Sequence, residues 1–354
     1  MLLAIAIRVV GAFWFYSLMV TQQTAFHFAW MEANPSLLPA GWRWLFLFNG
    51  GDSFQFPLIA MKGYAYPVYV FLPAYPMFIW VVGSLIENYW FGAFIVTQSF
   101  ALAAIVVFQL LAQLYMDPLE AAYATLLMAT FPYISVFTTL GYSEGVFLFA
   151  SIAAWYLYRR DRLVFSALLA GLTSVSRIYG FAIVVPVFLD IVRKKCWRRL
   201  AYLAIPTTFV LAWEMFCYAT TGDFLASLTD EKKFYAVTGS NLGLGPTILS
   251  QLTHGIPTAG LDPAIIASVA LFAFLTVMVW KVDVRLWAYT MIVFIVLLLT
   301  VPSHISLLRF LAFLFPLWLT VKIRSPIAVA ICLAIFIPMA LLMWLYTITV
   351  FFVG

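Results

Sequence analysis

The segment FGAFIVTQSFALAAIVVFQLLAQLY, residues 91–115, contains no charged side chain and is long enough to cross a membrane as one helix. A helix needs about 20 mainly apolar residues to span the roughly 30 Å hydrocarbon core of a bilayer. Comparable apolar runs recur along the 354 residues of the chain, of which 65% are hydrophobic and 9% charged. This composition excludes a water-soluble globular protein. It predicts an all-α, polytopic (multi-pass) integral membrane protein in which residues 1–354 form a single transmembrane domain.

The basic residues form short clusters between the apolar runs, at residues 159–162, 193–199, 281–285 and 322–324. Cytoplasmic loops of membrane proteins carry such an excess of Lys and Arg. We therefore place these clusters, together with Arg8, on the cytoplasmic side. The net charge of +5 then reflects membrane topology, and nucleic acid is not expected as a partner.

This topology places two long loops on the extracytoplasmic side, at about 28–70 and 222–262. About 9–12 membrane segments are expected, with candidate spans at about 4–27, 71–86, 91–115, 119–139, 143–158, 200–220, 264–280, 286–302, 308–321 and 326–350. The parity of the crossings fails by one before residue 119. Either the segment at 71–86 is re-entrant, or part of the 40–60 stretch dips into the membrane.

The segment between Arg162 and Arg193 has basic residues at both ends but is too short for two full crossings. As a helix, about 30 residues extend only about 45 Å at 1.5 Å per residue. The sequence therefore predicts two short half-helices with residues 174–180 near their tip. Irregular backbone at membrane depth is tolerated where protein or water satisfies it, so we expect Arg177 to face a polar cavity.

Polar side chains that the membrane does not explain gather on the predicted outer face. Asp52 lies in the first loop and is the candidate for a catalytic carboxylate, because a carboxylate can act as general base for a hydroxyl. The other candidates are Lys62, Tyr142, Glu144, Arg177, His304 and Arg309. Arg177, between half-helices in the membrane, is costly to bury and therefore functional by default.

No metal or cofactor is expected. The three cysteines, Cys196, Cys217 and Cys332, lie far apart without a C-x-x-C spacing, which argues against a disulfide framework and a zinc site. No Asp-x-Asp pair is placed to bind the metal of a nucleotide sugar, which favours a lipid-linked donor.

Four short motifs in chain order resemble the PIG-V family, the mannosyltransferases that add the second mannose to glycosylphosphatidylinositol anchors. The motifs are Asp52 followed by Ile-Ala-x-x-Gly-Tyr-x-Tyr at 59–66 and Phe-x-Pro-x-Tyr-Pro at 71–76, then Tyr-Ser-Glu-x-x-Phe at 142–147, Ser-Arg-Ile-Tyr-Gly at 176–180, and Arg309 followed by Phe-Pro at 315–316. The chain departs from the family pattern at Gly51, at Gln55 and at Ile178-Tyr179.

The resemblance implies a GT-C glycosyltransferase fold with a catalytic first extracytoplasmic loop, in the plasma membrane or the endoplasmic reticulum. The donor would be dolichyl- or polyprenyl-phosphate mannose, and the acceptor a lipid or glycan. Asp52 would be the general base of an inverting transfer, and Arg309 and Arg177 would neutralise the leaving phosphate. Lys62 and His304 are further candidates for substrate binding, as are Tyr142 and Glu144.

Simpler interpretations stay open for each of these residues. Asp52 could cap a surface helix, and Glu144 could be an acid favoured at a helix N-terminus. Arg177 could form a structural ion pair, and Arg309 could extend from a helix end to the membrane surface. His304 could be a turn residue, and Lys62 could contact lipid headgroups.

Two other functions also fit parts of the pattern. Broken helices with charges near the membrane midplane are typical of secondary transporters, so a transporter or lipid flippase is one alternative. A non-catalytic partner subunit of a glycosyltransferase is the other.

Overall fold

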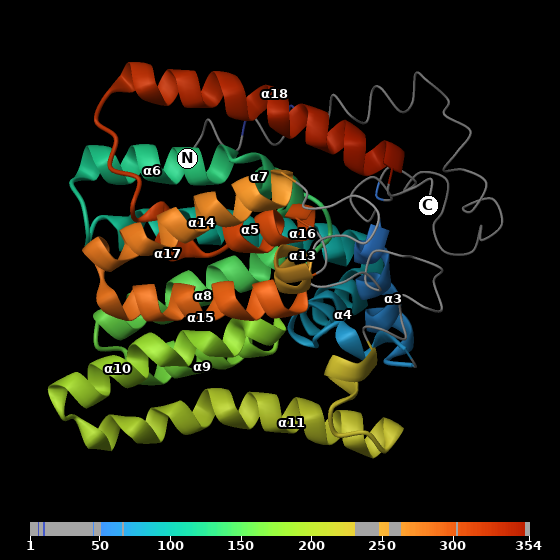
Figure 1. The fold of residues 1–354 in the computed structure, drawn as a ribbon. Coiled ribbons are helices and arrows are strands. Elements are labelled where there is room, and N and C mark those ends of the chain that lie inside the picture. The colour runs from blue at the N-terminus through green and yellow to red at the C-terminus, as the bar shows by residue number, and fades with distance from the viewer. Residues whose placement is uncertain are drawn as a thin grey trace.

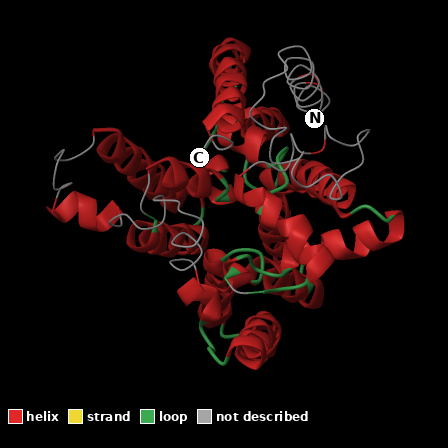
Figure 2. Ribbon diagram, turned by 90° about the vertical axis from the view of Figure 1, so that its right-hand side faces the viewer, coloured by secondary structure: helices red, strands yellow, loops and turns green. Residues whose placement is uncertain are grey.

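The computed structural model describes residues 6, 10, 45, 51–65, 67–230, 248–254, 263–301 and 304–350. This part of the chain consists of helices and connecting loops, without a strand (Figure 2). The predicted first span at about 4–27 lies outside the described residues apart from residues 6 and 10, as do most of 28–50 and parts of 222–262.

The first half of the chain forms these elements: η2 (Gly51–Phe54), α3 (Gln55–Lys62), η3 (Val68–Val70), α4 (Ala74–Ile86), α5 (Tyr89–Ala112), α6 (Pro118–Thr130), α7 (Pro132–Phe137), α8 (Glu144–Arg159) and α9 (Leu163–Ser174). The second half forms η4 (Ile178–Ile183), α10 (Val184–Lys194), η5 (Trp197–Leu203), α11 (Ala204–Thr221), α13 (Ile248–His254), α14 (Pro263–Val282), α15 (Val284–Thr300), α16 (His304–Ala312), α17 (Phe315–Trp318) and α18 (Pro326–Val350).

Most of the longer helices lie side by side along one direction, with α18 and α11 on opposite flanks (Figure 1). Among the described residues, four helical stretches are long and apolar enough to cross a membrane: Tyr89–Ala112, Trp197–Thr221, Ile265–Val282 and Pro326–Trp344. Shorter apolar helices stand beside them, including Leu163–Ser174 and Val284–Thr300. The protein is therefore an integral membrane protein.

The two ends of this helix array differ in charge. All four basic clusters lie in the connections α8–α9, α10–α11, α14–α15 and α17–α18, at the left-hand end in Figure 1, which we name the basic end. Buried acids balance part of this charge, since Lys194 Nζ lies 2.8 Å from Asp190 and Arg285 Nη2 lies 2.6 Å from Asp283. The opposite end, which we name the site end, carries α3, α13 and α16.

Two predicted spans are wrong as single helices. The stretch at 119–139 breaks at Phe131, where Pro132 opens the separate short helix α7. Proline lacks the amide hydrogen that a helix interior requires and disfavours a helical conformation at the residue before it. The stretch at 308–321 likewise divides into α16 and α17, with Pro316 in the first turn of α17.

The span predicted at 71–86 forms α4, which has 13 residues. This length is less than a full crossing requires, and the choice between a re-entrant 71–86 segment and a 40–60 stretch that dips into the membrane stays a prediction.

The predicted pair of short helices at 162–193 is confirmed. Helix α9 has 12 residues and α10 has 11, and the residues between them form a turn and the 3-10 helix η4. The tip is held to the first half of the chain, because the backbone amide of Ala74 donates to the carbonyl of Val175 at 3.1 Å. Arg177 lies at this tip, in extended backbone before η4.

Gly180 permits the close packing of η4 on the end of α9. A Cβ atom at residue 180 would overlap the backbone carbonyl of Thr173, whereas glycine leaves room. The turn is closed by the Gly180 amide, which donates to the carbonyl of Arg177 at 2.8 Å. Because Arg177 and Tyr179 belong to this turn, the close packing at Gly180 fixes the backbone positions of both residues.

We expect Gly180→Ala to lower the free energy of unfolding by about 1–3 kcal/mol, the usual effect of overpacking a rigid site. The matched control is Gly145→Ala in α8, where an added Cβ would meet its nearest neighbour, the Thr97 carbonyl oxygen, at an ordinary 3.5 Å. Thermal unfolding in detergent, followed by circular dichroism, compares the two variants. Equal unfolding temperatures for both would contradict this account of the turn.

Candidate functional site

Aromatic contacts hold α3, and with it Asp52, against the bundle. The Phe56 ring of α3 packs edge-on against Phe71 and Tyr75, with ring centroids 5.2 and 4.9 Å apart. The Tyr75 hydroxyl lies 2.6 Å from Thr97 Oγ1 in α5. Residues 71–76 of the Phe-x-Pro-x-Tyr-Pro motif thus anchor the helix that follows Asp52.

The Gly-Tyr pair after α3 turns the chain back. Gly63 has a φ of 81°, a backbone conformation that favours glycine. The next residue, Tyr64, donates from its hydroxyl to the carbonyl of Phe71 at 2.7 Å. Its ring lies 4.8 Å from that of Trp213 in α11. This motif therefore ties the first loop to α11.

The centre of the site is Glu144, the first residue of α8, whose side chain is fully buried. Its Oε1 atom pairs with the guanidinium groups of both Arg177 and Arg309. The Nε atom of Arg309 donates to the same oxygen at 2.6 Å. We name these three residues the Glu144 triad. It carries one net positive charge, because two cations share one carboxylate.

Aromatic rings surround the Arg309 guanidinium, which lies 3.9 Å from the ring centre of Phe137 and 4.2 Å from that of Tyr142. The Arg177 guanidinium lies 5.0 Å from the ring of Phe310. Such cation–π contacts stabilise a desolvated guanidinium. Because aromatic rings take the place of water around them, the two guanidinium charges are poorly screened.

Asp52 lies in η2 beside the triad and is partly buried. The next residue, Ser53, is hydrogen-bonded through its backbone to the Tyr142 hydroxyl. Burial raises the pKa of Asp52 above its ordinary value of 3.8, the positive charges of Arg309 and Arg177 oppose this rise, and the charge of Glu144 adds to it. A carboxylate with a raised pKa is a better proton acceptor than an ordinary aspartate.

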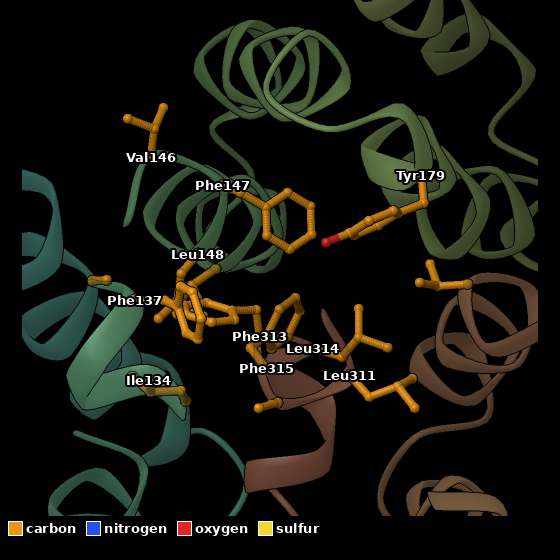
Figure 3. Packing of buried hydrophobic residues seen from close by; sticks show 14 of the residues in the cluster. Ile134, Phe137, Val146, Phe147, Leu148, Tyr179, Leu311, Phe313, Leu314 and Phe315 are labelled. Atoms are coloured by element: carbon orange, nitrogen blue, oxygen red, sulfur yellow. The ribbon is translucent and has the colours of Figure 1, made fainter. Parts of the chain in front are cut away.

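Three buried polar atoms near this cluster have no hydrogen-bond partner among the described residues: Glu144 Oε2, Arg177 Nε and the Tyr179 hydroxyl. Buried polar atoms are nearly always paired, so these three are exceptions that the packing of the described residues does not satisfy. Tyr179 belongs to the Ser-Arg-Ile-Tyr-Gly motif, but sequence reasoning gave it no role. Its hydroxyl points into the packed core beside Phe147 (Figure 3), and the centres of the two rings are 5.2 Å apart.

The remaining predicted residues do not join this cluster in the described part. Lys62 is exposed on the last turn of α3 and takes part in none of the described ion pairs. His304 begins α16, but its side chain falls outside the described side chains. No group of three or more His, Cys, Asp or Glu side chains in the described ranges could hold a metal ion.

Comparison with known proteins shows which solved fold this chain resembles. No protein-family model and no curated protein matches the chain. Among solved structures, it is similar to the crystal structure of ArnT from Cupriavidus metallidurans in the apo state. The TM-score is 0.51 and the sequence identity is 13%, over 80% of this chain and 57% of that chain.

ArnT is a glycosyltransferase of the GT-C superfamily. The fold of the chain is similar to that of ArnT, a GT-C fold. It spans little more than half the length of ArnT, and at this level of identity the likeness concerns the fold alone.

We expect Glu144→Gln to destabilise the protein by about 3–5 kcal/mol, because removing one member of a buried ion pair leaves its partners uncompensated. The matched control is Glu87→Gln, which makes the same change at an exposed position. Chemical denaturation in detergent measures both variants. A loss for Glu144→Gln no greater than that of the control would show that the triad contributes little to stability.

Asp52→Asn is expected to unfold at the same or a higher temperature than the wild type at neutral pH. A carboxyl whose pKa is raised by folding stabilises the folded state when protonated and loses that contribution as pH rises through the folded pKa. The amount by which the unfolding temperature of Asp52→Asn exceeds that of the wild type should therefore grow from pH 4 to pH 7. If Asp52→Asn instead loses stability relative to the wild type as the pH rises from 4 to 7, the pKa of Asp52 is not raised by folding.

Proposed function

We propose that the protein is a multi-pass GT-C mannosyltransferase that moves mannose from dolichyl- or polyprenyl-phosphate mannose to an extracytoplasmic lipid or glycan. The observation that carries the proposal is a partly buried carboxylate, Asp52, beside two guanidinium groups that share the buried Glu144. The GT-C fold supports a glycosyl transfer. The motif resemblance to the PIG-V family supports mannose as the sugar.

In the proposed reaction, Asp52 accepts the proton of an acceptor hydroxyl while that oxygen attacks the anomeric carbon of mannose. The bond between the anomeric carbon and the donor phosphate oxygen breaks with inversion, and the phosphate leaves with the electron pair. Its developing negative charge is stabilised by Arg309 and Arg177. Charge-assisted hydrogen bonds from arginine to phosphate are strong in a site shielded from water.

Glu144 acts in this proposal as a positioning residue. Its Oε1 atom holds the guanidinium groups of two distant segments side by side. The net positive charge of the triad suits the single negative charge of a phosphodiester donor. The unpaired Nε of Arg177 is available for one of its oxygens.

The charge distribution supports an extracytoplasmic site. The basic end carries the four Lys- and Arg-rich clusters, and Asp52, Glu144, Arg177 and Arg309 belong to the opposite end. Positive clusters face the cytoplasm in membrane proteins. The site end would then face the lumen or the cell exterior, where lipid-linked sugars serve as donors.

The direct test is transfer from radiolabelled polyprenyl-phosphate mannose to a total lipid extract by purified protein in detergent, with EDTA present. We expect wild-type transfer, and a loss of at least about 100-fold in Asp52→Asn, the usual share of a general base. Asp223→Asn, which neutralises another carboxylate at the site end, serves as the control and should retain activity. Transfer by Asp52→Asn at the wild-type rate would remove Asp52 as the base.

The pH profile gives a second readout of the same residue. Because the base must be ionised, kcat/KM should fall on the acid side with a midpoint above 3.8, the ordinary pKa of an aspartate. Absence of transfer by the wild type with every lipid acceptor would instead favour a transporter, a flippase or a non-catalytic subunit.

A further inference from the structure

Two connections at the basic end, α8–α9 and α10–α11, adjoin each other. The Nη1 atom of Arg199 in η5 lies 2.8 Å from Oδ1 of Asp161 in the α8–α9 connection, and η5 packs against both α9 and α10. Together the two connections carry five exposed cationic side chains that take part in none of the described ion pairs. We name these five residues the cationic patch: Arg160, Arg162, Arg193, Lys195 and Arg198.

The acids of this region are already engaged by other cations. Asp161 pairs with Arg199, and Asp190 pairs with Lys194 at 2.8 Å. These are the two acidic side chains in the α8–α9 and α10–α11 connections and the helices between them. The α17–α18 connection differs, because its exposed Arg324 is held by two acids at the start of α6. The cationic patch is therefore positive charge that the described part of the protein does not neutralise.

An exposed indole relates the patch to a membrane surface. Trp197 lies between Lys195 and Arg198 in the chain and is 56% exposed. It is also the first residue of Trp197–Thr221, a helical stretch long and apolar enough to cross a bilayer. Tryptophan is enriched at the level of the lipid headgroups. A crossing that begins at Trp197 places the cationic patch at the same level, beside the lipid phosphates.

We propose that the cationic patch binds the headgroups of phospholipids that carry a net negative charge. Guanidinium and ammonium groups donate charge-assisted hydrogen bonds to phosphate oxygens, and clusters of Lys and Arg beside a membrane helix attract anionic lipids. A zwitterionic headgroup gains less, because both acids of this region already have cationic partners and leave its ammonium group without a free carboxylate. The patch lies at the end of the helix array opposite the Glu144 triad, so the inference does not depend on the proposed reaction.

Trp197 can report the lipid beside the patch, because bromine on a lipid chain quenches the fluorescence of a nearby indole. The full-length protein is reconstituted in phosphatidylcholine bilayers that contain the same fraction of either brominated phosphatidylglycerol or brominated phosphatidylcholine. The difference between the wild type and Trp197→Phe isolates the signal of Trp197. We expect phosphatidylglycerol to be preferred at least about fivefold, the usual contribution of one cation near an anionic surface. Equal quenching by the two lipids would overturn the proposal.

A matched pair of double variants separates the patch from the overall charge of the basic end. Arg193→Gln with Lys195→Gln removes two charges from the patch, and Lys281→Gln with Lys322→Gln removes two exposed charges from the other connections. Each is compared with the same variant lacking Trp197. We expect the preference for phosphatidylglycerol to fall at least about fivefold in the patch variant alone. An equal fall in both variants would show attraction to the whole basic end, and a preference that the patch variant retains would exclude these residues; either result disproves the assignment.

Discussion

The buried carboxylate of Glu144 is the constraint on which the arrangement of the site end depends. It joins three segments that are far apart in the chain: the start of α8, the tip of the α9–α10 pair and helix α16. An ionised side chain without solvent is tolerated only when opposite charges and hydrogen bonds replace water. Because both guanidinium groups use Oε1, neither segment can move away without leaving a charge unpaired. The position of Asp52 is held separately, by the packing of Phe56 on Phe71 and Tyr75.

This arrangement holds more positive charge than is needed to neutralise the Glu144 carboxylate. A single arginine would neutralise Glu144, yet two are present, and Asp52 lies near them with a raised pKa. Burial disfavours the ionised form of Asp52, and the positive charges of the two arginines only oppose this effect. Active sites commonly contain such groups, whose ionised forms are unfavourable for folding but suited to proton transfer. Arg177 Nε and the Tyr179 hydroxyl, which are buried without a hydrogen-bond partner among the described residues, extend the same pattern.

Much of the helical content could be predicted from apolar run lengths, because a bilayer fixes how long a helix must be. The predictions at 143–158, 264–280 and 286–302 differ from α8, α14 and α15 by a few residues, and the short α9 and α10 followed from the distance between basic clusters. Prolines divided 119–139 and 308–321, where the run length alone suggested single helices. The residues of the Glu144 triad could be named from their motifs, but their pairing could not. Glu144 and Arg309 are 165 residues apart, and no local periodicity records such a contact. Nothing in the sequence could single out Tyr179. Its distinguishing feature is a buried hydroxyl without a hydrogen-bond partner among the described residues, and only the three-dimensional structure shows this.

The shortness of α9 has a consequence for the depth of the charged cluster. Its 12 residues extend about 18 Å, whereas the hydrocarbon core is about 30 Å thick. If the basic end lies at one membrane surface, as the proposed topology requires, Arg177 lies roughly 10 Å below the opposite surface. The bilayer next to the tip would then thin, or protein and water would fill the space above it. A molecule could then reach the charged cluster from either of two solvents, the hydrocarbon interior of the membrane or the aqueous phase above the tip.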